Sequence, residues 1–166
     1  MPVATPTLHM ICGKIASGKS TLAAKLASAS GTVLISEDAW LSALFSDQLT
    51  SPADYVRCTA RLRSVLGPHV TELLKAGVSI VLDFAANTVE VRQWMRGIIE
   101  DSGAKHRLHV LEVTDEACLA RLRDRNAEGA HEFAPTEAQF RIFMKHFALP
   151  TADEGFIVIR YGPGDS

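Results

Sequence analysis

The stretch Gly13-Lys14-Ile15-Ala16-Ser17-Gly18-Lys19-Ser20 lies between an apolar run, Leu8 to Cys12, and a helical pattern that begins at Thr21. Its spelling is G-x-x-x-x-G-K-S, the pattern of loops that bind nucleotide phosphates. The two glycines allow backbone angles that a side chain forbids, so successive N–H groups can turn towards a phosphate. A helix starting near Gly18 adds unpaired N–H groups and the positive end of its dipole. The stretch predicts a phosphate-binding loop, with a chance match in a Gly/Ser-rich turn as the alternative.

Two side chains of this loop have the chemistry that a nucleotide–magnesium complex needs. Lys19 supplies a positive charge for the β- and γ-phosphates, and the Ser20 hydroxyl supplies a ligand for Mg²⁺. We therefore expect ATP to bind to the whole loop, through Gly13, Lys14, Ile15, Ala16, Ser17, Gly18, Lys19, Ser20 and Thr21.

The bulk composition narrows the class of protein. A length of 166 residues predicts a single domain over residues 1–166, and 47% hydrophobic with 22% charged residues is ordinary for a soluble protein. The net charge of −2 gives no reason to expect bulk nucleic-acid binding, although a nucleic-acid end stays open as a substrate. Three cysteines without a C-x-x-C pair fit a reducing compartment. No run approaches the ~20 apolar residues of a membrane span, and we expect a cytoplasmic monomer or weak dimer.

Apolar runs alternate with helical patterns along the chain. The runs predict five strands, at Thr7–Cys12, Thr32–Ile35, Val78–Asp83, Leu108–Val113 and Phe156–Ile159. Such alternation is typical of a parallel sheet with helices on both faces, so the expected fold is α/β with three α/β/α layers. Ligands of such sheets bind at the carboxyl ends of the strands.

Several helix signals are local. Gly67-Pro68 interrupts the helical stretch from Ala53 to Ala76 and predicts a kink or two helices end to end. Asn87 with Glu90 predicts the start of a helix, and Thr136 with Gln139 forms a capping box for the last one.

Periodicity assigns the aromatic residues of the last helix to the core. The apolar face of that helix consists of Phe140, Phe143, Met144 and Phe147. The histidines have no metal-ligand spacing, and we expect His106 and His109, which flank the fourth strand, to be surface or edge residues.

Carboxylates follow two of the predicted strands. Asp83 ends the third strand, where it can hold Mg²⁺ beside Ser20; a cap of the chain turn is the alternative, and the upstream loop favours the metal. Glu37 and Asp38 follow the second strand, where a carboxylate can take the proton of an attacking hydroxyl. The alternative is structural: two acids in the first turn of a helix are stabilised by the helix dipole. We favour Asp38 over Glu37 as the base.

Arg121 and Arg125 are four residues apart, so they share one helix face. Cations suit the end of a helix, and these two could also close on the ATP phosphates or stack on the base. The polar segment after them predicts a short lid at about residues 126–135, whereas Arg123 points elsewhere and is expected to be solvated. Arg57 and Arg61, in the stretch after the second strand, share a face that we expect to be solvated.

Four segments together resemble the small P-loop kinases of the nucleoside-monophosphate-kinase type. Within them the chain is most similar to the AAA_33 group, with zeta-toxin-like, chloramphenicol-phosphotransferase-like and polynucleotide-kinase-like proteins. The segments are Gly13–Ser20, Ile35–Asp38, Val81–Phe84 and Leu119–Asn126. The resemblance implies a sheet order of 2-3-1-4-5. It also implies that Asp38 activates the acceptor, that Asp83 is the aspartate of strand three, and that Arg121 and Arg125 are lid arginines.

These features lead to an expected activity. The chain is expected to be an ATP- and Mg²⁺-dependent kinase that transfers the γ-phosphoryl group to a hydroxyl of a small molecule, with Lys19, Asp38, Arg121 and Arg125 as the catalytic residues. Nothing between Trp40 and Leu74 matches a known acceptor signature. The alternatives are a polynucleotide 5′-hydroxyl kinase and a nucleotide-binding regulatory ATPase without an acceptor.

Overall fold

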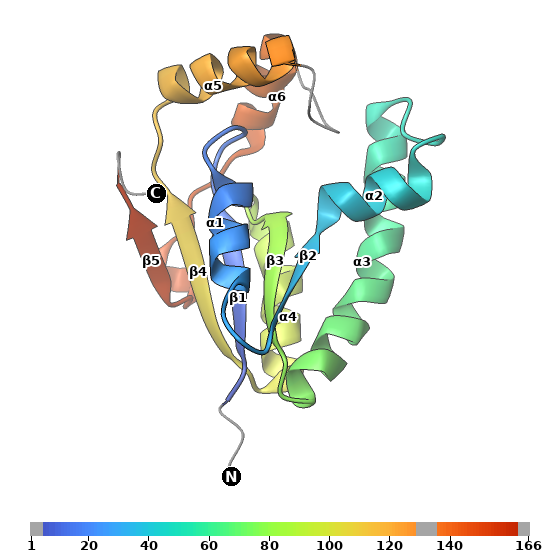
Figure 1. The fold of residues 1–166 in the computed structure, drawn as a ribbon, viewed down its shortest axis with the longest axis vertical. Helices are drawn as coiled ribbons and strands as arrows, with labels where there is room; N and C mark the ends of the chain where they lie inside the picture. Colours follow the sequence, from blue (N-terminus) through green and yellow to red (C-terminus); the bar gives the residue numbers. More distant parts are fainter. Residues whose placement is uncertain (1–4, 129–135, 163–166) are drawn as a thin grey trace.

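The computed structural model describes residues 5–128 and 136–162, and a five-stranded sheet forms its centre (Figure 1). The strands are β1 (Thr7–Cys12), β2 (Thr32–Ser36), β3 (Ser79–Ala85), β4 (Lys105–Leu111) and β5 (Val158–Tyr161). Their order is β2-β3-β1-β4-β5, and every neighbouring pair is parallel. The predicted strand order is confirmed.

Helices cover both faces of the sheet, which confirms the three-layer architecture (Figure 1). In the described residues they are α1 (Lys19–Ala27), α2 (Glu37–Phe45), α3 (Pro52–Lys75), α4 (Val89–Ser102), α5 (Asp115–Glu128) and α6 (Glu137–His146), with a short 3-10 helix, η1 (Ala152–Glu154). Helix α1 lies on one face and α3 and α4 on the other, while α5 and α6 lie above the carboxyl ends of the strands. No helix in the described part of the chain is long and apolar enough to span a bilayer.

The central strand β1 separates two apolar clusters. Leu8 and Met10 face the larger cluster, which α3 and α4 complete, and Ile11 faces a smaller one with Leu22 of α1. Burial on both faces explains why this strand is an almost uninterrupted apolar run.

Helix α3 is continuous where the sequence predicted an interruption at Gly67-Pro68. The proline removes one backbone donor, but the helix is held by eight buried residues along its length. Gly67 packs closely against α4. A Cβ at this position would lie only 3.1 Å from the indole nitrogen of Trp94. Of the two expectations, two helices end to end is therefore wrong, whereas a kink within the one helix stays a prediction; tertiary packing outweighs the local cost of the proline.

Strands β3, β4 and β5 begin and end at other residues than the hydrophobic runs predicted, and β3 continues past Asp83 to Ala85. Strand β4 starts three residues earlier, at Lys105, because this end of the strand pairs with Thr7 of β1. Strand β5 starts at Val158 and continues through Arg160 and Tyr161, which pair with the end of β4. Edge pairing, which periodicity does not report, sets the bounds of β4 and β5.

His109 is a buried residue of β4, so its assignment to the surface is wrong. Its side chain is 2% exposed and lies between His9 and Tyr161. The His109 Nε2 atom is 2.9 Å from His9 Nδ1, and its Nδ1 atom is 2.8 Å from the Tyr161 hydroxyl. Burial, with the charges of His9 and Arg107 added, lowers the pKa of His109 to about 4.

This pKa predicts an acid-labile fold. Between the unfolded value of about 6.5 and about 4, the unfolded chain binds a proton that folded His109 excludes, so stability falls as the pH falls. The loss is ~3 kcal/mol for a shift of this size. In urea unfolding at pH 7, 5.5 and 4, His109→Gln should lose less stability than wild type. The exposed His69→Gln serves as the control, and parallel curves for all three proteins would contradict the role of His109.

Candidate active site

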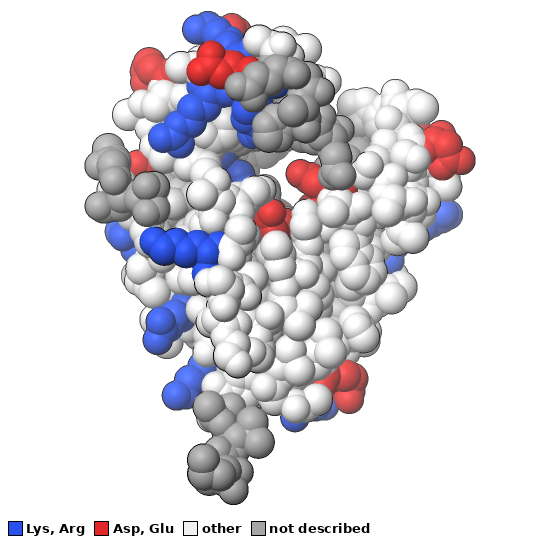
Figure 2. Space-filling model, in the orientation of Figure 1, with Lys and Arg blue, Asp and Glu red and all other residues white. Residues whose placement is uncertain are grey.

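A cavity of about 840 Å³ opens at the carboxyl ends of the strands, between the α5–α6 pair and the α2–α3 side (Figure 2). Most residues that the sequence singled out line it: Ile15, Ala16, Ser17, Gly18, Lys19, Ser20, Thr21, Glu37, Asp38, Asp83, Arg121 and Arg125. Gly13 and Lys14 do not line it. The loop after β1, the acids after β2 and the acid of β3 therefore meet at one site.

The two glycines of the loop act in different ways. Gly18 has φ of 101° and precedes α1, as predicted. Gly13 has no positive φ, so the expectation of a special backbone angle is wrong there. A Cβ at position 13 would lie 2.5 Å from Ser17 Oγ and 3.3 Å from Lys19 Cγ. Gly13 is needed for space, and Ala16, between the two glycines, is also left-handed, with φ of 63°.

The Lys19 ammonium is held by the loop itself. Its Nζ atom donates to the carbonyl oxygens of Gly13 and Lys14, each at 2.9 Å. Burial lowers the pKa of Lys19, and the nearby carboxylates of Asp83 and Asp38 oppose that shift. The charge is thus fixed at the mouth of the loop, where a phosphate would replace the two carbonyls.

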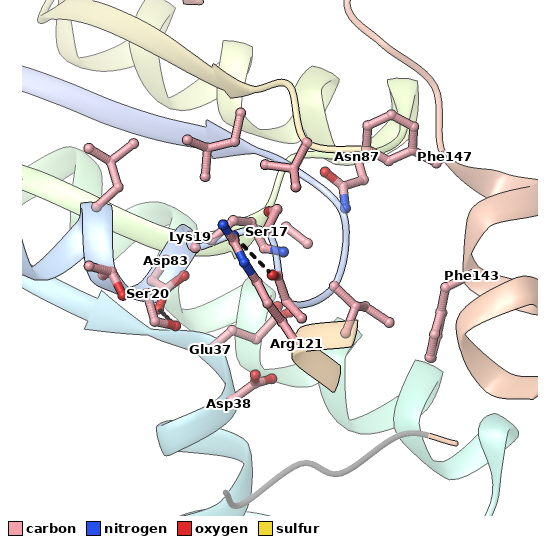
Figure 3. Close-up of a pocket in the computed structure, with 18 of the residues that line it drawn as sticks. Ser17, Lys19, Ser20, Glu37, Asp38, Asp83, Asn87, Arg121, Phe143 and Phe147 are labelled. Atoms are coloured by element: carbon pink, nitrogen blue, oxygen red, sulfur yellow. Dashed lines mark hydrogen bonds between the residues drawn. The ribbon is translucent and has the colours of Figure 1, made fainter. Parts of the chain in front are cut away.

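Ser20 and Asp83 lie in contact. The Ser20 hydroxyl donates to Asp83 Oδ2 at 3.0 Å (Figure 3). A hydroxyl and a carboxylate oxygen this close fit a magnesium ion, which prefers hard oxygen ligands. Within residues 5–128 and 136–162 no group of three His, Cys, Asp or Glu side chains could hold a metal ion. Phosphate oxygens and water would have to complete such a site, as is usual for Mg²⁺.

Helix α2 directs its first two residues differently. Ser36 caps the helix by accepting a hydrogen bond from the Ala39 N–H at 3.3 Å, as predicted. Glu37 is 4% exposed and pairs with Arg63 of α3, whose Nη2 is 3.0 Å from Oε2. Burial raises the pKa of Glu37, and Arg63 opposes that shift. Asp38, the next residue, is exposed at the cavity (Figure 3).

The two arginines of α5 both reach the cavity. Arg121 Nη1 donates to the Ala16 carbonyl at 3.5 Å, and Arg125 Nε is buried without a hydrogen-bond partner among the described residues. Arg123 is exposed and pairs with Glu137 of α6. The predicted lid falls partly in α5, which ends at Glu128, and its remaining residues, 129–135, lie outside the described residues.

Lys14 joins the loop to the start of α5. The sequence predicted instead that Lys14 contacts the nucleotide. Its Nζ atom is 2.6 Å from Asp115 Oδ1 and donates to the Val113 carbonyl at 3.2 Å. Ile15 and Ala16 pack on the apolar cluster between α5 and α6. The loop is therefore braced by both lid-side helices.

Asn87 contacts the phosphate-binding loop, whereas the sequence predicted that it starts a helix. Its side chain accepts from the Gly13 N–H at 2.9 Å and donates to the Gly13 carbonyl at 2.7 Å. The cap of α4 is instead Thr88, whose hydroxyl accepts from Val91 N–H at 3.2 Å. Asparagine and threonine are both good caps, so the sequence pattern did not separate them.

Two aromatic residues assigned to the core line the cavity, and of these Phe147 also packs against the larger apolar cluster, as predicted. Only Phe140 of the predicted aromatic face is buried, at 2% exposure, whereas Phe143 is 39% exposed. Phe143 and Phe147 lie across the cavity from Ser20 and Asp83 (Figure 3). Helical spacing marks an apolar face, and it does not distinguish a core from the wall of a cleft.

Comparison with known proteins identifies the fold of this site. The sequence profile of the AAA_33 family, an AAA domain, matches residues 8–150. No curated protein sequence matches the chain. Solved structures do match it, and each shares less than a quarter of its residues with this chain in the alignments given below.

Three structures illustrate the likeness. A provisionally named kinase from Chloroflexus aurantiacus has a TM-score of 0.74 at 21% identity, over 97% of this chain and 87% of that one. Kti12 of Chaetomium thermophilum, solved with ADP-AlF3, has a TM-score of 0.72 at 15% identity, over 97% of this chain and 91% of that one. The APS kinase CysC of Mycobacterium tuberculosis, solved with AMPPNP and APS, has a TM-score of 0.62 at 20% identity, over 99% of this chain and 92% of that one. The chain has the α/β P-loop kinase fold.

The close packing at Gly13 predicts a loss of phosphate binding in Gly13→Ala. The added methyl group displaces Ser17 and crowds Lys19, and overpacking of this kind costs ~1–3 kcal/mol. The affinity for an ATP analogue, measured by calorimetry, should fall about tenfold or more. The control is Gly97→Ala in α4, where a Cβ meets nothing within 4 Å. Equal affinities of the two variants would contradict the steric role of Gly13.

Proposed function

We propose a function from one premise: this chain belongs to the AAA_33 family of AAA domains. The protein is an ATP- and Mg²⁺-dependent phosphotransferase that moves the γ-phosphoryl group to a hydroxyl of a small molecule. The observation that carries the proposal is the meeting of the Lys19 loop, the Ser20–Asp83 pair and the Asp38 carboxylate in one cavity. These are a donor site and an acceptor base within reach of the same space.

The loop and lid form the donor half. Lys19 exchanges the carbonyls of Gly13 and Lys14 for phosphate oxygens, and Ser20 and Asp83 hold the metal. Bound magnesium neutralises charge on the transferred group. Arg121 and Arg125, which border the cavity from α5, add positive charge as the phosphoryl group moves.

Asp38 is the acceptor base in this proposal. The charge of Glu37 is already compensated by Arg63, and its side chain is buried, which makes Glu37 the weaker candidate. Asp38 takes the hydroxyl proton as the acceptor oxygen bonds to the γ-phosphorus. The bond from that phosphorus to the β–γ bridging oxygen breaks, and ADP leaves.

In this function residues 1–166 act as one kinase domain, in the cytoplasm, as a monomer or weak dimer. Its three cysteines, Cys12, Cys58 and Cys118, are buried and unpaired, which fits a reducing compartment.

Lys19→Ala tests the donor half. Removing the ammonium leaves the phosphates without their nearest fixed charge, so the affinity for AMP-PNP should fall about 100-fold or more. Calorimetry measures the affinity, and circular dichroism checks the fold. Lys75→Ala, an exposed lysine at the end of α3, is the matched control. Unchanged affinity in Lys19→Ala would remove the premise that this loop binds the nucleotide.

Asp38→Asn tests the acceptor half. Loss of the base should lower transfer of ³²P from ATP to a pool of hydroxyl compounds about 100-fold. AMP-PNP affinity should stay within about twofold, since Asp38 is not in the donor half. Asp101→Asn, exposed at the end of α4, is the control. ATP turnover that is equal with and without the pool, in wild type and Asp38→Asn alike, favours the regulatory ATPase; transfer to oligonucleotide ends alone favours the polynucleotide kinase.

A further inference from the structure

Arg63 of α3 contacts the sequence neighbours of two carboxylates of the site. It pairs with Glu37, which precedes Asp38. Its guanidinium also lies near the ring of Phe84, which follows Asp83. The Arg63 side chain borders the cavity and is 23% exposed. The proposed function gives Arg63 no part in the reaction, although it joins the chain segments that carry the acceptor base and a metal ligand.

The contact between Arg63 and Glu37 is a fork of two hydrogen bonds. Arg63 Nε donates to Glu37 Oε2 at 3.1 Å, and Arg63 Nη2 donates to Oε1 at 3.4 Å. Two such bonds fix the orientation of a carboxylate as well as its distance. The Glu37 side chain is 6% exposed, so salt screens this pair much less than a surface pair. The first residue of α2 is therefore held on α3.

Aromatic rings also hold the guanidinium of Arg63. Its central carbon lies 6.0 Å from the centroid of the Phe84 ring and 5.7 Å from that of Trp94. At these distances a guanidinium is attracted to the face of an aromatic ring. The two rings stack with their centroids 5.5 Å apart, and Phe84 is fully buried in β3. Arg63 thus has one anchor on α2 and another on β3 and α4.

Helix α2 leaves the sheet at the point where this anchor lies (Figure 1). Strands β2 and β3 pair as far as Ser36 and Asp83, and α2 begins at the next residue, Glu37. Of the nine residues of α2, two are buried, Glu37 and Leu41. The fork is therefore made by one of the two buried residues of the helix, and by the one that adjoins the acceptor base.

We propose that Arg63 is a positioning residue, which holds the acceptor base Asp38 at a set distance from the metal ligand Asp83. The inference rests on the proposed function, because that function supplies the roles of the two aspartates. Phosphoryl transfer needs the attacking oxygen close to the γ-phosphorus and in line with the bond that breaks. A misplacement of about 1 Å can cost ~100-fold in rate, so a fixed start of α2 matters for the reaction.

The double variant Glu37→Leu/Arg63→Met separates positioning from stability. Apolar residues of similar volume can replace a buried ion pair without loss of stability, so the urea midpoint should stay close to that of wild type. Because the fork is gone, ³²P transfer from ATP to a pool of sugars, nucleosides and other alcohols should fall about tenfold or more. The affinity for AMP-PNP should stay within about twofold. Arg57→Met, which removes the exposed partner of Asp54 on the same helix, should change neither transfer nor affinity.

A second readout measures the geometry itself and needs no acceptor. With Mn²⁺ and AMP-PNP in the donor half, the paramagnetic ion broadens the NMR signal of the ¹³C-labelled carboxyl carbon of Asp38, which Asp38→Asn identifies. The broadening depends on the distance from the ion to that carbon. It should differ from wild type in the double variant and match wild type in Arg57→Met. If Arg63 acted only by binding the acceptor, the broadening would be the same in all three proteins.

Wild-type transfer in the double variant would overturn the inference, and so would an unchanged Asp38 signal. If the double variant does not fold, Arg63→Lys decides, since lysine keeps the charge but cannot form the fork. Lower transfer with a changed signal then supports the inference, and a wild-type value of either overturns it. A wild type that labels no alcohol counts against the proposed function instead, and the Asp38 signal then decides the positioning on its own.

Discussion

Two hydrogen bonds between the Asn87 side chain and the backbone of Gly13 join the phosphate-binding loop to the end of β3. The rest of the site depends on this contact, because it fixes the first residue of the loop. The Asn87 carbonyl also accepts from Ala148 N–H at 2.8 Å, beyond the end of α6. Arg92, fully buried, donates to the carbonyls of Ala86 and Ala148 at 2.9 and 2.7 Å and pairs with Glu154 at 2.7 Å.

This network makes the two sides of the cavity one structure. The segment after β3 and the segment after α6 meet around the Arg92 guanidinium, whose charge Glu154 compensates, and Asn87 joins the loop after β1 to them. A buried arginine is tolerated only when its donors are satisfied, and here the satisfied donors hold backbone carbonyls in position. Phe147, one residue before Ala148, thus reaches the cavity wall from a fixed anchor.

The sequence predicted those features that depend on neighbouring residues. The loop spelling, the caps at Ser36 and Thr136 and the order of apolar runs are local signals, and the structure contains them. The grip of Asn87 on Gly13 joins residues 74 apart, and the burial of His109 depends on strands on both sides. The space required at Gly13 is set by Ser17 and Lys19 after folding. Such contacts are properties of the packed molecule, and no spacing rule reports them.

The resting contacts of Lys19 have a consequence for which anions the loop can hold. Two of the three donors of its ammonium already have carbonyl partners, so a ligand that takes these donors must compensate for both hydrogen bonds. A hydrogen bond from a charged donor contributes about 1.5–3 kcal/mol, and the exchange is favourable only for a ligand that returns at least as much. A chain of phosphates with a bound cation supplies many oxygens at once, whereas a single small anion supplies few. A nucleotide with its cation can therefore replace both carbonyls at less cost than a small inorganic ion can, which favours the nucleotide over sulfate or phosphate in this loop.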